Sequence, residues 1–196
     1  MVLIADDVIE TTHISSKTLR DSKTLVEEKV EVTFHPLNQA HEPRSIDICT
    51  LLEEDSLAPL FSGSEWAGTR VWVSALEGVN YMIDNEIFEK VREQKMKKIG
   101  NNTKTHCGVN VIELGAGLAV PGLATGVINE EYEKAHPTAN DWCVVVSDMG
   151  SLQKQLEGNV KLNFPENDKL VARTLDWSVA GLEELIKSIP SEVKSK

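Results

Sequence analysis

The sequence predicts an α/β fold with a parallel sheet of about three strands flanked by helices, preceded by an N-terminal β extension. Two observations support this fold class. Between residues 109 and 178, three short apolar runs alternate with helical segments. Each run ends at a glycine or an acidic residue, where a buried strand would reach the rim of a sheet. Strands that alternate with helices imply parallel pairing through right-handed crossovers.

Three strand–helix units follow one another in this region. The first strand is predicted to be buried and leads into the tight turn Gly115–Gly117. Pro121 fits the first turn of the helix that follows, because N–H groups in the first turn have no hydrogen-bond acceptor within the helix and proline lacks this N–H. The predicted strands are Val109–Leu114, Trp142–Ser147 and Leu170–Leu175, and the predicted helices cover Val120–Ile128, Ser151–Asn163 and Leu182–Ile189.

The N-terminal part, residues 1–60, is predicted to be a β extension that packs on the main domain of residues 61–196. Leu25–His35 alternates loosely and contains several Val and Thr residues, which favours a strand, and Val8–Ser15 can pair with it. Ile46–Glu54 fits either a short strand or a helix. Beyond the break near residue 61, Val71–Arg92 has helical periodicity, and Lys95–Gly108 has the composition of a basic loop.

Charge and cysteine content restrict the class of function. The net charge of −11 argues against a nucleic-acid partner, because phosphate binding needs a basic surface. Cys49, Cys107 and Cys143 form no CxxC pair, which is typical of free thiols in a reducing compartment. The start of the chain lacks a basic signal-peptide region, and no apolar run of about 18 residues predicts a membrane helix. We therefore expect a cytoplasmic protein without a membrane partner; the nucleus is an alternative location.

The turn after the first strand is the strongest candidate for a ligand site. In Glu113-Leu114-Gly115-Ala116-Gly117, a strand leads into glycines and then a helix, so the backbone can approach a ligand closely. Dinucleotide-binding enzymes use this geometry with the fingerprint GxGxxG, but Val120 stands where the third glycine would be. A carboxylate at Glu113 would repel a pyrophosphate and suits a cationic amino group instead.

Two further acidic positions follow the next strands. Asp148 ends the second strand, where an acidic side chain accepts hydrogen bonds from a ribose diol. Asp176 and Trp177 end the third strand, where a carboxylate and an indole could hold an adenine ring. Together these positions predict a nucleoside-type ligand at one rim of the sheet.

Four segments in order resemble the class I, seven-strand methyltransferases, which have a Rossmann-like sheet. The resemblance is strongest to their lysine-methyltransferase-like group and covers about residues 61–180. It rests on VIELGAGLAVPGLA (111–124), VWVSA (71–75), Ser147-Asp148 followed by Leu156–Asn163, and Leu175-Asp176-Trp177, with Ser178 in place of the group's glycine.

This resemblance implies S-adenosylmethionine as cofactor and a protein side chain, with lysine favoured, as substrate. It implies cofactor contacts from Trp72, the turn Gly115-Ala116-Gly117, Asp148 and Trp177, and it implies that Glu113 orients the amino-acid end of the cofactor. The family fold contains further strands after the third, so we expect this chain to hold only the cofactor-binding half. No catalytic residue is assigned, and the oligomeric state stays open.

Two other functions fit parts of the pattern. One is an NAD-dependent oxidoreductase, against which the missing third glycine stands. The other is a truncated, inactive cofactor-binding or regulatory product. The site residues also have structural explanations: Asp148 could cap the next helix, Trp72 and Trp177 could pack in the core, and Glu113 could be a solvated strand end. The five histidines lack metal-ligand spacing, so no metal is expected.

Overall fold

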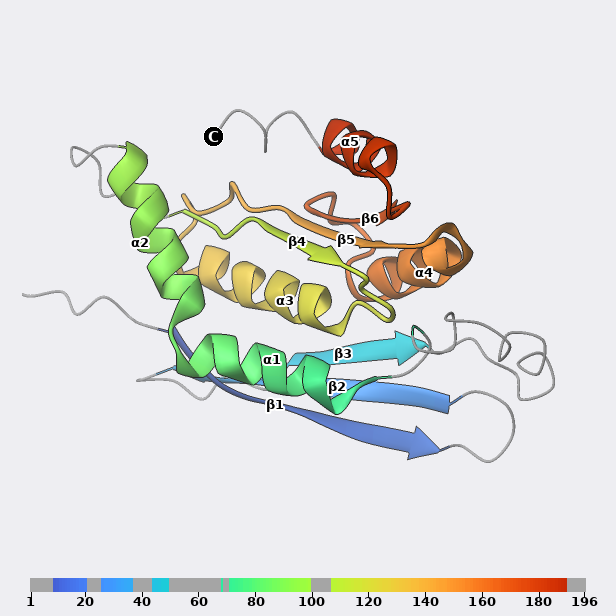
Figure 1. Cartoon of the computed structure of the whole chain (residues 1–196). Coiled ribbons are helices and arrows are strands. Elements are labelled where there is room, and N and C mark those ends of the chain that lie inside the picture. The colour runs from blue at the N-terminus through green and yellow to red at the C-terminus, as the bar shows by residue number, and fades with distance from the viewer. Residues whose placement is uncertain are drawn as a thin grey trace, which may run out of the picture.

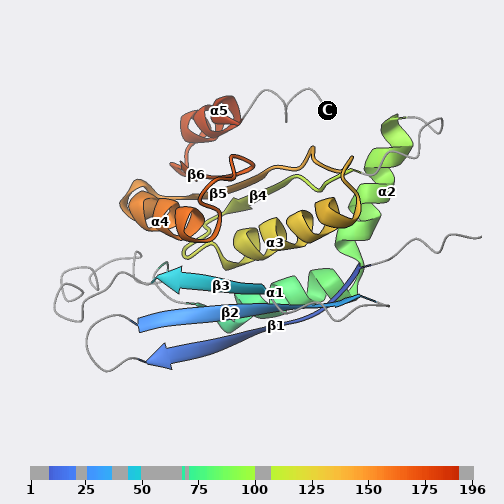
Figure 2. The same cartoon turned by 180° about the vertical axis from the view of Figure 1, so that it is seen from behind.

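The computed structural model describes residues 9–20, 26–36, 44–49, 68, 71–99 and 107–189. These residues form two three-stranded sheets, one antiparallel and one parallel, with helix α3 (Val120–Ala135) between them (Figure 1). The view from behind shows the same layers, with α5 (Val179–Ser188) on the far side of the parallel sheet (Figure 2). The α/β class with an N-terminal β extension is therefore confirmed.

The parallel sheet contains β4 (Val111–Leu114), β5 (Val144–Asp148) and β6 (Leu170–Thr174) in the order β4-β5-β6. All residues of the middle strand, β5, are buried, as its continuous apolar sequence predicts. The prediction of a buried first strand is wrong for two residues of β4, since Ile112 is 49% and Leu114 is 48% exposed. They are exposed because β4 lies at an edge of this sheet, while α5 packs over β5 and β6.

The helices after these strands confirm the predicted alternation. Helix α3 continues past Ile128 to Ala135, and most of its residues are buried because it contacts strands of both sheets. Helix α4 (Gln153–Asn163) is preceded by the short 3₁₀ turn η4 (Gly150–Leu152). Helix α5 begins at Val179, where the Ser178 hydroxyl accepts a hydrogen bond from the Gly181 N–H and caps the helix.

The N-terminal strands are β1 (Ile9–Arg20), β2 (Val26–Pro36) and β3 (Arg44–Cys49). The predicted pairing of the first two strands is confirmed, and it is antiparallel with an irregularity between Thr11 and His13. The predicted segment Ile46–Glu54 is a strand as far as Cys49, and residues 50–54 lie outside the described residues. The domain boundary near residue 60 also lies outside them and stays a prediction.

Strand β3 joins the N-terminal sheet to the rest of the molecule. Ile46 and Ile48 are fully buried in the same core as the side chains of α3 and α4. The Asn163 amide accepts a hydrogen bond from the Asp47 N–H and donates one to the Asp47 carbonyl, both at 2.8 Å. Arg44 adds an ion pair with Glu130 at 3.0 Å. Through β3, the N-terminal sheet therefore packs against the main core.

The segment Val71–Arg92 forms two helices, α1 (Val73–Asp84) and α2 (Ile87–Ile99). They are separated at Asn85 and Glu86, because Glu86 adopts a left-handed backbone conformation with φ of 53°. The prediction of a loop over Lys95–Gly108 is wrong at its start, where α2 continues to Ile99; residues 100–106 lie outside the described residues. None of the described helices is long and apolar enough to cross a membrane.

Candidate functional site

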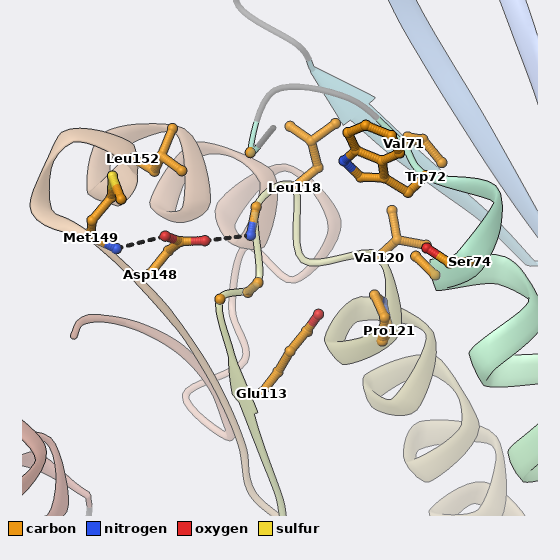
Figure 3. A pocket seen from close by; sticks show the side chains of 15 residues that line it. Val71, Trp72, Ser74, Glu113, Leu118, Val120, Pro121, Asp148, Met149 and Leu152 are labelled. Atoms are coloured by element: carbon orange, nitrogen blue, oxygen red, sulfur yellow. Dashed lines mark hydrogen bonds between the residues drawn. The ribbon is translucent and has the colours of Figure 1, made fainter. Parts of the chain in front are cut away.

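A cavity of about 430 Å³ lies at the carboxyl ends of β4 and β5, where parallel sheets place their ligands. The first turn of α1, the glycine turn after β4, the start of α3 and the segment after β5 surround it (Figure 3). Its lining residues are Gly68, Val71, Trp72, Ser74, Ala75, Glu113, Gly115, Ala116, Gly117, Leu118, Val120, Pro121, Asp148, Met149 and Leu152.

The glycine turn depends on backbone conformations that suit glycine. Gly115 and Gly117 have φ angles of 67° and 54°, in the left-handed region where a Cβ is strained. The backbone of Gly68 also approaches so closely that a Cβ on Gly117 would lie 3.2 Å from it. The Ala116 N–H donates to the Ser147 carbonyl at 3.0 Å and fastens the turn to β5. The turn therefore presents fixed backbone to the cavity.

Asp148 is buried at the end of β5, and both of its carboxylate oxygens accept backbone hydrogen bonds. Its Oδ2 accepts from the Gly117 N–H and its Oδ1 from the Met149 N–H, each at 2.7 Å (Figure 3). The carboxylate thus holds the glycine turn beside the start of η4. Each oxygen has a second lone pair, so this structural role is compatible with accepting hydrogen bonds from a ligand.

Glu113 lies on β4 and its side chain points toward the start of α3 (Figure 3). Its Oε2 accepts a hydrogen bond from the Gly122 N–H at 2.8 Å. Burial raises the pKa of Glu113 to about 7, the nearby Asp148 carboxylate adds to this, and the Gly122 hydrogen bond opposes it. Glu113 is partly buried and therefore changes its charge near neutral pH.

Gly122 makes this position of Glu113 possible. A Cβ on Gly122 would lie 2.7 Å from Glu113 Oε2 and 2.2 Å from Val146 Cγ1. Because both distances are far below van der Waals contact, only glycine lets α3 pack on β5 while the carboxylate reaches the helix N-terminus. The sequence signal for this role is the Pro121-Gly122 pair that follows the turn.

The two candidate tryptophans are placed differently. Trp72 is the residue before α1 and lines the cavity with 43% of its surface exposed. Trp177 does not belong to the lining, although its ring lies 3.5 Å from where a Cβ on Gly115 would be. It is 65% exposed. The structure thus brings together every predicted site residue except Trp177 around one cavity, and the roles of all of them stay predictions.

Several lining residues were not predicted from sequence. Met149 and Leu152 form an apolar wall beside Asp148, and Ser74 and Pro121 face the other side of the cavity. The apolar residues directly after an acidic strand end are the signal that could have identified Met149 and Leu152. The cavity thus combines apolar walls with a few polar groups, which is typical of a small-molecule site.

The ionisable side chains that line the cavity are all acidic. Of the residues that line it, Glu113 and Asp148 are acidic and none is basic. A ligand with cationic groups fits such a site better than one with phosphates, because two carboxylates repel an anion. Within the described part of the chain, no group of three His, Cys, Asp or Glu side chains is arranged to hold a metal ion.

A family model described as lysine methyltransferase matches residues 52–192, which include α1, the parallel sheet and the whole cavity lining. No curated protein matches the chain.

Proposed function

The chain belongs to the lysine methyltransferase family, and from this premise we propose that its cavity binds S-adenosylmethionine for methyl transfer to lysine side chains of proteins. The observation that carries the proposal is the pair of carboxylates, Glu113 and Asp148, beside a glycine turn in a cavity with no basic lining residue. The cofactor carries an ammonium and a sulfonium and has no phosphate, so its charges suit this pair.

The residues of the cavity fit the parts of this cofactor. The left-handed turn Gly115–Gly117 leaves room for a ligand against bare backbone. The second lone pairs of Asp148 are available to ribose hydroxyls, and Met149 and Leu152 offer an apolar surface for a flat ring. Glu113 is placed to attract an ammonium group, and the indole of Trp72 to cover the ligand.

When bound, the cofactor supplies a methyl group attached to a positively charged sulfur. The contribution of the protein is to hold that group in line with the acceptor and to exclude water. The ammonium group of a lysine acceptor, with an ordinary pKa of about 10.4, must first lose a proton. We assign no residue of this chain to that step, and the family match supports the protein substrate.

The family match also favours methyl transfer over an NAD-dependent oxidoreductase. The position of Glu113 argues in the same direction, because its carboxylate occupies the N-terminus of α3, where a dinucleotide enzyme binds the pyrophosphate. Binding of NADH without binding of S-adenosylhomocysteine would reverse this choice.

The first test is calorimetric titration with S-adenosylhomocysteine, the demethylated cofactor. The Asp148→Asn variant should bind about tenfold or more weakly, since a hydrogen bond to a charged group contributes about 1.5–3 kcal/mol. Asp168→Asn is the matched control, because Asp168 is exposed in the loop before β6, away from this cavity. Equal affinity of all three proteins, or no binding by the folded chain, would refute the proposed site.

The second test measures the reaction itself. The purified chain is incubated with cofactor carrying a labelled methyl group and with a cell lysate, and labelled lysine is sought in digests of the proteins. The proposal is supported if the wild-type chain produces labelled lysine and the Asp148→Asn variant produces much less. A chain that binds S-adenosylhomocysteine but transfers no label fits the alternative of an inactive cofactor-binding or regulatory product.

A further inference from the structure

We propose that helix α4 positions the end of the glycine turn, and that Asn159 and Asn163 connect this turn to the N-terminal strand β3. Neither asparagine lines the cavity, and β3 contributes no residue to its lining. The effect of β3 on a bound ligand therefore passes through α4. The inference rests on the proposed function, since it concerns affinity for the same cofactor, and it adds two positioning residues outside the cavity.

The peptide group between Leu118 and Ala119 is the part of the turn that α4 holds. Its carbonyl, on Leu118, accepts a hydrogen bond from Asn159 Nδ2 at 3.4 Å, and the Asn159 side chain is fully buried. Its N–H, on Ala119, donates to the Ala116 carbonyl at 2.7 Å. The peptide group is thus held from both ends, on one side by the turn itself and on the other by α4.

Ala119 depends on this support because of its backbone conformation. Its φ of 62° and ψ of 28° lie in the left-handed region, which is unfavourable for a residue with a Cβ. Ala119 is buried and directly precedes α3, so rotation of its peptide group would move the first turn of that helix. Val120 and Pro121 of this first turn, and Leu118 before it, line the cavity (Figure 3). A donor that fixes the Leu118 carbonyl therefore fixes this wall of the site.

Asn163 connects the same face of α4 to β3. It lies four residues after Asn159, and residues at this spacing are neighbours on one side of a helix. Asn163 Nδ2 donates to the carbonyls of Asn159 and Asp47, and Asn163 Oδ1 accepts from the Asp47 N–H, each at 2.8 Å. Ile46 and Ile48 of β3 are buried in one core with α4. A shift between β3 and α4 would therefore displace the donor that holds the turn.

The experiment is calorimetric titration of the full chain and its variants with S-adenosylhomocysteine. Asn159→Ala removes the donor to the Leu118 carbonyl and should weaken binding about three- to tenfold, as expected for the loss of one hydrogen bond. Asn163→Ala keeps this donor but releases α4 from Asp47, so it should weaken binding by a smaller factor of about two to three. The double variant should bind about as weakly as Asn159→Ala, because both residues act on one peptide group.

Asn129→Ala is the matched control. Asn129 on α3 bridges the N–H and the carbonyl of Val109, each at 3.0 Å, in the same way as Asn163 bridges those of Asp47. Val109 precedes β4, at the end of the strand opposite to the glycine turn. The control variant should lose stability in a similar way and keep the affinity of wild type. All titrations are made at a temperature at which every variant is folded, so that lost stability alone leaves the affinity unchanged.

A second measurement needs no ligand. Hydrogen exchange at the Ala119 N–H should be faster in Asn159→Ala and in Asn163→Ala than in wild type, and unchanged in Asn129→Ala. Ala119→Gly supplies a rescue, because glycine adopts the left-handed conformation without a clash of a Cβ. Added to Asn159→Ala, it should recover most of the lost affinity. If Asn159→Ala does not fold, Asn163→Ala, whose side chain is only half-buried, carries the test through both measurements.

The outcomes separate this inference from the proposed function. If wild type binds S-adenosylhomocysteine and the folded asparagine variants bind it equally well, the positioning role is refuted while the cofactor site stands. The same conclusion follows if Asn129→Ala loses as much affinity as they do. If folded wild type binds no S-adenosylhomocysteine, the proposed function fails, and exchange at Ala119 alone decides whether α4 holds the turn: faster exchange in Asn159→Ala supports this role, and unchanged exchange refutes it.

Discussion

Replacement of Glu113 by glutamine should change the pH dependence of stability in a way that needs no ligand. The pKa of Glu113 is about 7 in the folded chain against an ordinary 4.5. An acid whose pKa is raised by folding stabilises the folded state, relative to the unfolded state, only while it is protonated. The contribution of Glu113 to the free energy of unfolding is therefore fully present below about pH 4.5 and is lost as the pH rises through about 7. At about 1.36 kcal/mol per pKa unit, ionisation of Glu113 lowers the free energy of unfolding by about 2.5 kcal/mol between about pH 5 and pH 8.

Urea unfolding followed by circular dichroism at several pH values measures this effect. The glutamine variant cannot ionise, so its free energy of unfolding should rise relative to wild type by about 2.5 kcal/mol from about pH 5 to pH 8. Glu184→Gln, which removes an exposed carboxyl on α5, supplies the control for the loss of one acidic group. A constant difference between wild type and Glu113→Gln across the whole range would refute the burial argument for Glu113.

Two further changes test the packing that positions the site. Gly122→Ala should lower the free energy of unfolding by about 1–3 kcal/mol, because its Cβ would meet Val146 and Glu113, whereas Gly158→Ala in α4, with nothing within 4 Å, should raise it by about 0.5–1 kcal/mol; equal effects in thermal unfolding would contradict the close approach at Gly122. Asn163→Ala removes both hydrogen bonds to the Asp47 backbone and should lower the free energy of unfolding by about 1–3 kcal/mol. Hydrogen exchange at the Asp47 amide should accelerate in this variant, and unchanged protection would show that β3 is held by other contacts.

The alternation of strands and helices could be predicted from the sequence because β5 is buried on both faces. A continuous apolar run of this length is typical of a strand in a parallel sheet that is covered on both faces. The same reasoning overestimated the burial of β4, because the sequence of Ile112 and Leu114 does not show where α5 will pack. The break between α1 and α2 was also missed, since neither glycine nor proline marks Glu86 as left-handed.

The site residues that lie at the ends of the parallel strands could be predicted from the sequence. Glu113, the glycine turn and Asp148 end or follow adjacent parallel strands, so their side chains meet at one rim. Gly122 was missed because its role depends on the distance between α3 and β5, which no local pattern reveals. Trp177 was expected at the ligand but does not line the cavity, since the chain after β6 turns at Asp176 and Ser178 toward α5.

The bond between Asp47 and Asn163 has a consequence for synthesis on the ribosome. The two residues lie 116 positions apart, so β3 leaves the ribosome long before its partner on α4 exists. At about 5–20 residues per second, the wait is on the order of 6–25 s. During that interval Ile46 and Ile48 lack the side chains of α4 that complete their burial, so apolar surface of β3 stays exposed on the nascent chain until α4 has been made.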